Sequence, residues 1–228
     1  MNSLFDTYGD AMLDAFWVTI RLTFWSAIGA TVWGTILAGM RVSPVPVLRF
    51  FGTWYVNLFR NTPLTLIIVF CSVGLYQNLG IHFTSESSPT FIRDNGFWLS
   101  VLGFVLYTSA FVCESLRSGI NTVPIGQAEA ARSLGLGFRQ TLTLVVLPQA
   151  FRSVIAPLGS VLIALVKNTT IASAIGVAEA ALLMKEMIEN ESDQLFSVFG
   201  IFAIGFMILT LPIGFAFGYA SKKLAVKR

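Results

Sequence analysis

Long apolar stretches separated by short polar ones dominate the pattern of the chain. Residues 195–220 include 26 positions without a single Asp, Glu, Lys or Arg. About 20 apolar residues, at 1.5 Å each along a helix, cross the ~30 Å hydrocarbon core of a bilayer. We therefore predict an all-α membrane protein. Its five expected spans cover residues 15–40, 54–79, 97–116, 150–166 and 195–220.

The number of spans between residues 141 and 184 is open to a second interpretation. Residues 141–150 are apolar, Arg152 divides the run that follows, and residues 171–184 are apolar enough to suggest a further span. A six-span protein is therefore the alternative.

The distribution of charge favours five spans and predicts an orientation. With five spans, one side of the membrane receives ten basic residues and one acid, Glu129. The other side receives three basic residues and ten acids. Basic residues near span ends are retained in the cytoplasm. We therefore place the N-terminus outside and the C-terminus inside, where the basic group includes Lys222, Lys223, Lys227 and Arg228.

Composition excludes most other classes of protein. Only 12% of the residues are charged, against about 25% in soluble domains. The sole histidine, His82, excludes H-E-x-x-H and any multi-histidine metal site. There is no G-x-S-x-G motif. We expect neither an enzyme nor a metal site.

A few residues within the spans invite specific interpretations. Small side chains allow helices to approach closely in lipid. Arg21 is expected to extend toward the outer headgroups, and Glu114 to form either an i,i+3 ion pair with Arg117 or a transport site. The expected packing positions are Ala30, Gly34 and Ala38 in the first span and Gly214 and Gly218 in the fifth.

The loop at residues 117–149 is patterned rather than merely polar. Pro124 suits a helix start, residues 127–134 are mostly good helix formers, and Gly135 suits a left-handed helix end. The loop therefore predicts a short alanine-rich helix on the cytoplasmic side. Leu147-Pro148 closes the segment that follows.

This loop resembles the EAA loop of ABC importer permeases. Glu129, Ala130 and Ala131 are followed after three residues by Gly135, and nine residues later come Val145, one residue, and then Leu147-Pro148. Every spacing fits the family pattern, with Val145 where Ile is commoner. The resemblance implies the type I importer permease fold, in which the EAA helix docks into an ATPase subunit.

The resemblance also implies partners. The sequence has no G-x-x-x-x-G-K-[ST] phosphate loop, so ATP and Mg are expected on a separate ATPase chain, with no cofactor on this one. The expected complex is located in a bacterial cytoplasmic membrane. It contains two ATPase chains, an extracellular solute-binding protein and two permeases. We expect a heterodimer of permeases, with a homodimer as the alternative.

Further motifs resemble the polar amino acid branch of the family. Residues 59–64 are similar to its Arg-Gly-Thr-Pro motif, although Asn61 replaces the Gly. Residues 107–110, 166–170 and 175–179 match as well, and the likeness extends to permeases of actinobacterial glutamate uptake systems. Candidates for the substrate path are Arg60, Asn61, Thr62, Asn168, Thr169 and Thr170.

Two alternatives remain for the function. The cargo of an ABC permease could be another polar solute. An ATP-independent channel or secondary carrier is the second alternative. Such carriers usually bury ionisable residues at mid-membrane, whereas the middles of these spans are apolar.

Overall fold

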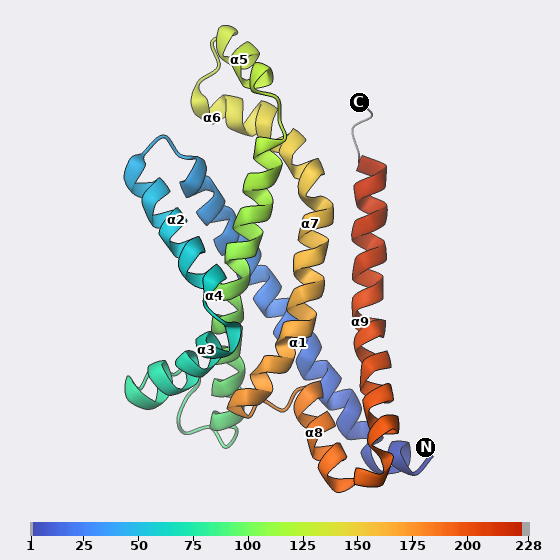
Figure 1. The fold of residues 1–228 in the computed structure, drawn as a ribbon. Helices are drawn as coiled ribbons and strands as arrows, with labels where there is room; N and C mark the ends of the chain where they lie inside the picture. The colour runs from blue at the N-terminus through green and yellow to red at the C-terminus, as the bar shows by residue number, and fades with distance from the viewer. Residues whose placement is uncertain (1, 225–228) are drawn as a thin grey trace.

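The computed structural model describes residues 2–224, and every regular element within them is helical. Figure 1 shows α4, α7 and α9 side by side, with α1 crossing them at an angle and α2 beside α4. The helices in chain order are α1 (Asn2–Val42), α2 (Pro46–Asn61), α3 (Leu64–Val69), η1 (Phe70–Asn78), α4 (Phe91–Asn121), α5 (Ile125–Ser133), α6 (Phe138–Gln140), η2 (Thr141–Val146), α7 (Leu147–Asn168), η3 (Thr169–Ile175), α8 (Ala180–Asn190), η4 (Ser192–Gln194) and α9 (Leu195–Leu224).

Helix α1 is much longer than the first predicted span, residues 15–40. Its 41 residues extend about 60 Å at 1.5 Å each, about twice the ~30 Å hydrocarbon core. The helix begins early because Leu4 and Met12 are buried against α8 and α9, in one cluster with Met187 and Phe202. Packing, rather than membrane thickness, therefore sets the start of this helix.

The second predicted span, residues 54–79, falls on two helical segments that are separated by a sharp bend. Helix α2 begins earlier, with Pro46 in its first turn, where proline's missing N–H is not needed. Pro63 then interrupts the hydrogen bonding and holds Thr62 in an extended conformation, with φ −95° and ψ 130°. The segments Pro46–Asn61 and Leu64–Asn78 meet at 103°.

The other three predicted spans coincide with long helices. Four helical stretches within residues 2–224 are long and apolar enough to cross a membrane, and the bent pair would make a fifth. Helix α8 has 11 residues, about 16 Å, which is too short to cross. The region proposed for a sixth span therefore provides no spanning helix.

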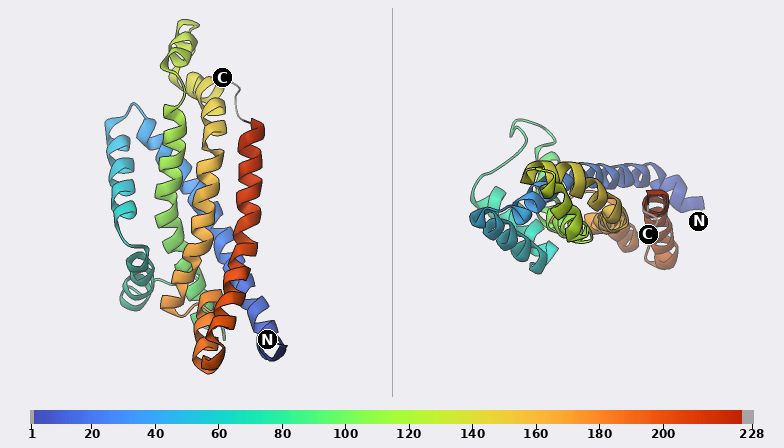
Figure 2. Two further views of the ribbon diagram at one scale, coloured as in Figure 1. Left: turned by 45° about the vertical axis from the view of Figure 1, so that its right-hand side comes forward. Right: turned by 90° about the horizontal axis from the view of Figure 1, so that it is seen from above.

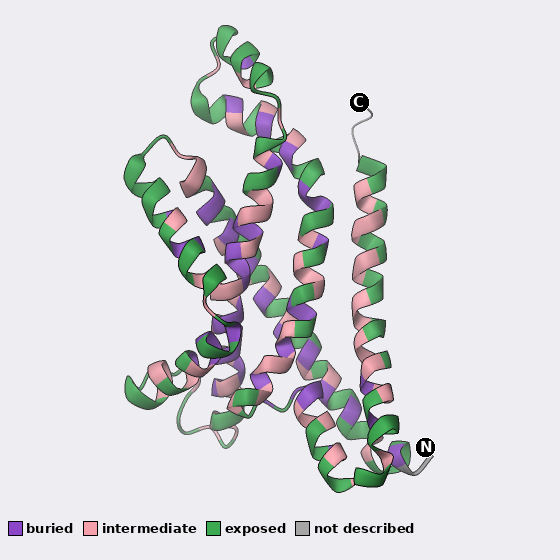
Figure 3. Cartoon of the chain, viewed as in Figure 1, coloured by how far each residue is buried: buried purple, intermediate pink, exposed green. Residues whose placement is uncertain are grey.

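The main core lies where α1, α3, α4 and α7 meet. Figure 3 shows buried residues concentrated along α4 and its neighbours, whereas nearly all of α9 is exposed or only partly buried. Gly34 brings α1 close to α4, because a Cβ there would lie 2.7 Å from Val112. The core cluster consists of Leu22, Leu64, Ile68, Phe97, Val101, Phe104, Leu165, Ala172 and Val177.

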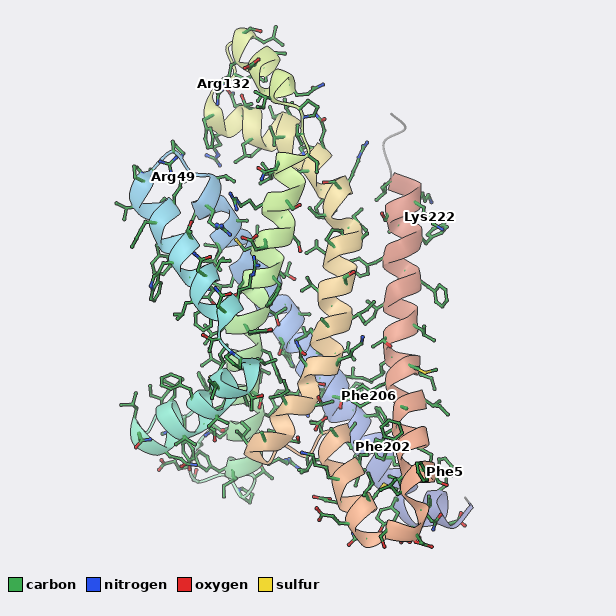
Figure 4. The ribbon with its side chains drawn as sticks, viewed as in Figure 1. Phe5, Arg49, Arg132, Phe202, Phe206 and Lys222 are labelled. Carbon is green, nitrogen blue, oxygen red and sulfur yellow. The ribbon has the colours of Figure 1, made fainter. Side chains whose placement is uncertain are left out.

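The two ends of the bundle differ in their side chains. Helix α5 and the C-terminal end of α9 lie at one end, and the start of α1 and α8 lie at the other (Figure 1). Arg49, Arg132 and Lys222 lie toward the α5 end, whereas Phe5 and Phe202 lie toward the α8 end (Figure 4). Opposite ends for the start of α1 and the end of α9 agree with an odd number of crossings.

The helices form an open row rather than a closed ring. Seen from above, α2 and α9 lie at opposite ends of an elongated arrangement, with α1 along one side (Figure 2).

Candidate coupling loop and transport path

Helix α5 protrudes from one end of the bundle (Figure 1). Glu129, Ala130 and Arg132 are exposed on it, whereas Ala131 is 4% exposed because α5 packs on η2. Helix α5 thus exposes one face, with Glu129, Ala130 and Arg132, and packs its other face against η2, which directly precedes α7.

The end of α5 has the conformation expected of Gly135, whose φ is +82°. Its N–H donates to the Arg132 carbonyl at 2.9 Å, and the Leu136 N–H donates to the Ala131 carbonyl at 3.2 Å. This pair of hydrogen bonds is a Schellman cap, in which glycine avoids the penalty of a Cβ in the left-handed region. The chain therefore turns sharply after Ser133.

The segment after Gly135 differs from the expected loop. From Phe138 the chain is helical through Ile175, so Leu147 and Pro148 lie inside a helix rather than at the end of a loop. Pro148 is tolerated in the first turn of α7. Both residues line an apolar cavity of about 680 Å³ between α1, α4 and α7.

Glu114 contacts two arginines from two other helices. Its Oε1 pairs with Arg41 Nη1 of α1, and its Oε2 lies 3.3 Å from Arg60 Nη1 of α2. The expected pair with Arg117 is wrong, since among residues 2–224 the ion pairs of Glu114 are those with Arg41 and Arg60. Sequence reasoning missed this cluster because Arg41 and Glu114 are 73 residues apart.

Arg60 is the last-turn residue of α2, not the start of a span. It lies 14 residues after Pro46, about 21 Å along the helix. Asn57, Arg60 and Asn61 are all exposed, and their i, i+3, i+4 spacing puts them on one face. Asn61 Nδ2 donates to the Asn57 carbonyl at 2.8 Å. A polar stripe thus follows α2 to the break before Pro63.

Asn168, Thr169 and Thr170 lie at the junction of α7 with η3. Thr169 is buried, and its hydroxyl donates to the Val166 carbonyl at 2.7 Å; that of Thr170 donates to the Lys167 carbonyl at 2.8 Å. Thr62 likewise donates to the Leu58 carbonyl, at 2.8 Å. These hydroxyls donate to carbonyls of the preceding helical turn in their own segments.

The two expected path segments lie in neighbouring elements. Helix α3, which follows Thr62, packs against η3, which begins at Thr169. Leu64 and Ala172 belong to the same core cluster. The structure thus brings the α2–α3 break and the α7–η3 junction to the same region of the bundle.

The α8 end contains a cavity of about 730 Å³ between α1, α4 and α8, lined by both charged and apolar side chains. Arg21 lines it, with its guanidinium carbon 4.9 Å from the Phe97 ring centroid. Asp14, Asp94 and Glu186 lie around the same cavity. That the Arg21 side chain extends to the outer headgroups stays a prediction. The cation–π contact with Phe97 gives the Arg21 guanidinium an aromatic partner.

Glu179 is a buried carboxyl group that sequence reasoning did not single out. It is fully buried at the start of α8, where it accepts hydrogen bonds from the backbone of Ala181 and Leu182 at 2.9 and 3.0 Å. Burial raises the pKa of Glu179 to about 7, while these hydrogen bonds and nearby Lys185 oppose the rise. The Ala180 N–H donates to Thr19 Oγ1 at 3.2 Å, which ties this corner to α1.

No cluster of three or more metal-ligating side chains occurs within residues 2–224. Cys71 and Cys113 are buried free thiols.

Known proteins resemble this chain over its full length. Two glutamate transport system permease proteins named GluC, from Corynebacterium efficiens and Corynebacterium glutamicum, are 62% and 63% identical over 228 residues, covering all of both chains. The probable glutamine ABC transporter permease protein GlnM of Bacillus subtilis is 34% identical, covering 98% of this chain and 97% of its own.

Solved structures agree with this likeness. A chain from the crystal structure of an amino acid ABC transporter with histidines matches with a TM-score of 0.82 and 26% identity, covering 95% of each chain. A chain of the inward-facing MetNI methionine ABC transporter matches with a TM-score of 0.73 and 18% identity, covering 94% of this chain and 96% of that one. The fold is that of a type I ABC importer permease, as the EAA loop predicted.

The model of one protein family matches residues 13–225, nearly the entire chain. This chain, a multi-pass membrane transport subunit, belongs to the family of binding-protein-dependent transport system inner membrane components.

Proposed function

We propose that this chain is a permease subunit of an ATP-driven importer whose cargo is glutamate. The observation that carries the proposal is the 62–63% identity, over the full length of all three chains, to two glutamate transport permeases. We further propose that residues 1–228 form a single transmembrane domain, with residues 117–149 as its coupling loop.

The α5 end of the bundle faces the cytoplasm in this proposal, and the start of α1 faces outward. The position of Arg49, Arg132 and Lys222 toward the α5 end supports this orientation, because basic residues near span ends are retained inside. Lys227 and Arg228, which belong to the same expected basic group, lie outside the described residues. The membrane is the bacterial cytoplasmic membrane.

Helix α5 transmits movement from the ATPase. Its exposed Glu129 and Ala130 contact the partner, while Ala131 packs against η2 and so joins α5 to α7. Gly135 fixes the turn between them, and Leu147 and Pro148 mark where the movement enters the membrane. ATP and Mg bind to the partner ATPase.

A second permease completes the path, and an external binding protein delivers the cargo. The open row of helices supports the need for a second permease, because one such row encloses no path (Figure 2). A heterodimer is proposed, with a homodimer as the alternative. ATP-driven closure of the ATPases turns the path outward, the binding protein releases its cargo, and hydrolysis restores the inward-open state.

The substrate path passes the polar stripe of α2 and the α7–η3 junction. Polar side chains at membrane depth face a water-filled cavity or the bundle rather than lipid. This argument assigns Arg60, Asn61 and Thr62 to the path, and the packing of α3 on η3 adds Asn168, Thr169 and Thr170.

Transport in vesicles tests the cargo. The chain is co-purified with its ATPase and second permease, placed in proteoliposomes, and supplied with binding protein and labelled glutamate, glutamine, aspartate and arginine. We expect ATP-dependent uptake with glutamate preferred. A preference for glutamine would reassign the cargo, and uptake by the chain alone without ATP would replace the ABC mechanism with that of a carrier.

A glycine pair tests the coupling loop. Gly135→Val forces a β-branched residue to a φ of +82°, which costs roughly 1–3 kcal/mol and distorts the turn after α5. We expect ATP hydrolysis to continue while uptake falls about tenfold or more. Gly137→Val is the matched control, because Gly137 is exposed and has an ordinary extended conformation, with φ −66°. Equal uptake by the two variants would contradict the assignment.

A further inference from the structure

The Glu114 cluster contains more positive than negative charge. Two guanidinium groups, from Arg41 and Arg60, share one carboxylate. Among residues 2–224, no second carboxylate lies within ion-pair distance of either arginine. The cluster therefore has one unbalanced positive charge, about 21 Å along α2 from its first residue, Pro46. An unbalanced charge at this depth is costly, so a further anion would be stabilised there.

The two arginines hold Glu114 unequally. The side chain of Arg41 is 8% exposed, whereas that of Arg60 is 47% exposed and lies 3.3 Å from the carboxylate oxygen. A long contact from a half-exposed side chain contributes little stability. Arg41 is thus the lasting partner of Glu114, and Arg60 is the exchangeable one.

The surroundings of Arg60 are open and polar. Asn57 and Asn61 flank it on the exposed face of α2, and the helix ends one residue later, before the break at Pro63. A guanidinium group binds a carboxylate through two parallel hydrogen bonds. A ligand arriving from this face would therefore meet a free cation beside amide groups.

We propose that Arg60 binds a carboxylate of the transported amino acid by exchanging it for Glu114. This inference rests on the proposed function, since it takes the cargo to be an amino acid. Arg41 keeps Glu114 neutralised when Arg60 turns away, so the exchange leaves no carboxylate unpaired in the membrane. Glu114 therefore acts as an internal competitor of the cargo.

Binding measurements on paired variants test this exchange. The probe is labelled L-glutamate, and the sample is the complex of both permeases and the ATPase in lipid nanodiscs, without the binding protein. Arg60→Gln removes a charge-assisted contact worth about 1.5–3 kcal/mol, so binding should weaken roughly 10- to 100-fold. Glu114→Asp has a shorter side chain that stays with Arg41 but no longer reaches Arg60, so binding should tighten severalfold.

The opposite signs of the two effects are diagnostic, because a merely structural ion pair would weaken binding in both variants. Arg117→Gln is the matched control on α4; Arg117 is exposed, and no change is expected. Thermal unfolding of each complex shows whether the variant is folded, and Arg60→Lys, which keeps the charge but loses the two-pronged geometry, should weaken binding less than Arg60→Gln.

The outcomes separate this inference from the proposed cargo. Wild-type binding of glutamate with no change, or with parallel changes, in Arg60→Gln and Glu114→Asp would overturn the exchange alone. If the wild-type complex prefers a different amino acid, the cargo is wrong and the same variants are measured with that amino acid. A complex that binds no carboxylate compound overturns both.

Discussion

Helices α4 and α9 are both long and apolar, yet they have opposite roles in the chain. In the most apolar stretch of α4, 61% of the residues are buried by the rest of the chain, against 11% in α9. The more apolar of the two, α9, is the less buried. Lipid tails are as apolar as leucine, so hydrophobicity marks a segment as membrane-spanning but does not drive it into the core. What distinguishes the two helices is whether small residues allow a neighbouring helix to pack closely.

Small residues illustrate this difference directly. On α1, Ala30, Gly34 and Ala38 are all buried, Gly34 lies against Val112 of α4, and Ala38 shares a cluster with Ala110 of α4, so the packing face expected from their spacing is confirmed. On α9, a Cβ at Gly214 would have only Ile163 nearby, at 3.5 Å, and one at Gly218 would meet nothing within 4 Å. Small residues at the same four-residue spacing are therefore packed against a neighbour in α1 but lie open in α9 within this chain.

The largest expected effect comes from truncating a large buried side chain in the core around α4. Phe104 is 0% exposed, whereas Phe215 on α9 is 74% exposed. Phe104→Ala should destabilise the chain by about 3–5 kcal/mol, because the cavity is incompletely filled. Phe215→Ala should change stability by less than about 0.5 kcal/mol. Reversible unfolding in mixed micelles of detergent and SDS gives both values, and similar losses would remove the contrast between the two helices.

The second effect concerns the corner that joins α9 to the bundle through α8. The carboxyl group of Glu179 has an ordinary pKa of 4.5 when unfolded and a pKa of about 7 when folded. Between these values the folded chain holds the extra proton, so the contribution of Glu179 to stability is most favourable below pH 4.5 and falls as the pH rises toward 7. At about 1.4 kcal/mol per pKa unit, the total is a few kcal/mol at most.

Glu179→Gln should abolish this dependence, which is measured as the difference between wild-type and variant unfolding midpoints from pH 5 to 8. Glu186→Gln is the control on α8, because Glu186 is exposed and its substitution should leave the slope intact. A wild-type slope that persists in Glu179→Gln would assign the titration to another group.

The third effect comes from overfilling the helix contacts. A Cβ at Gly34 would lie 2.7 Å from Val112 and 2.8 Å from the Ser109 carbonyl oxygen. Gly34→Leu should therefore destabilise the chain by about 1–3 kcal/mol. Gly218→Leu should leave the unfolding of the chain unchanged. If it prevents assembly with the second permease, as judged by size-exclusion chromatography, the open face of α9 is part of that interface.

Local signals in the sequence predicted local structure well. Pro124 and Gly135 bracket α5 as predicted, because each acts on its own backbone. The family spacing from Glu129 to Pro148 likewise predicted the fold. A single motif of known spacing carries more information than the apolar runs, whose ends are set by distant packing.

The features that the sequence did not predict depend on contacts between distant segments. Helix α1 extends back to Asn2 because it packs on α8 and α9, which follow more than 170 residues later. Glu114 pairs with Arg41 and Arg60 rather than with Arg117, although Arg117 is three residues away. No periodicity along the chain reports which arginine lies opposite a carboxylate on another helix.

The smallest expected effect is a single hydrogen bond between α2 and α4. The Tyr55 hydroxyl donates to the Leu106 carbonyl at 2.9 Å and lies 3.1 Å from Ser109 Oγ. Tyr55→Phe should destabilise the chain by about 0.5–1.5 kcal/mol. Tyr219→Phe on α9, where the side chain is 68% exposed, should change stability by less than about 0.5 kcal/mol.

A double-mutant cycle with Ser109→Ala separates the two contacts of the Tyr55 hydroxyl. If the hydroxyl group acts mainly through the Leu106 carbonyl, the losses from Tyr55→Phe and Ser109→Ala add to within about 0.5 kcal/mol. A larger coupling would show that Ser109 and Tyr55 act as a pair. The contrast between α4 and α9 would then extend to polar contacts, since α4 would use a hydroxyl pair to hold α2, whereas the Thr210 hydroxyl on α9 donates to the Phe206 carbonyl of its own helix.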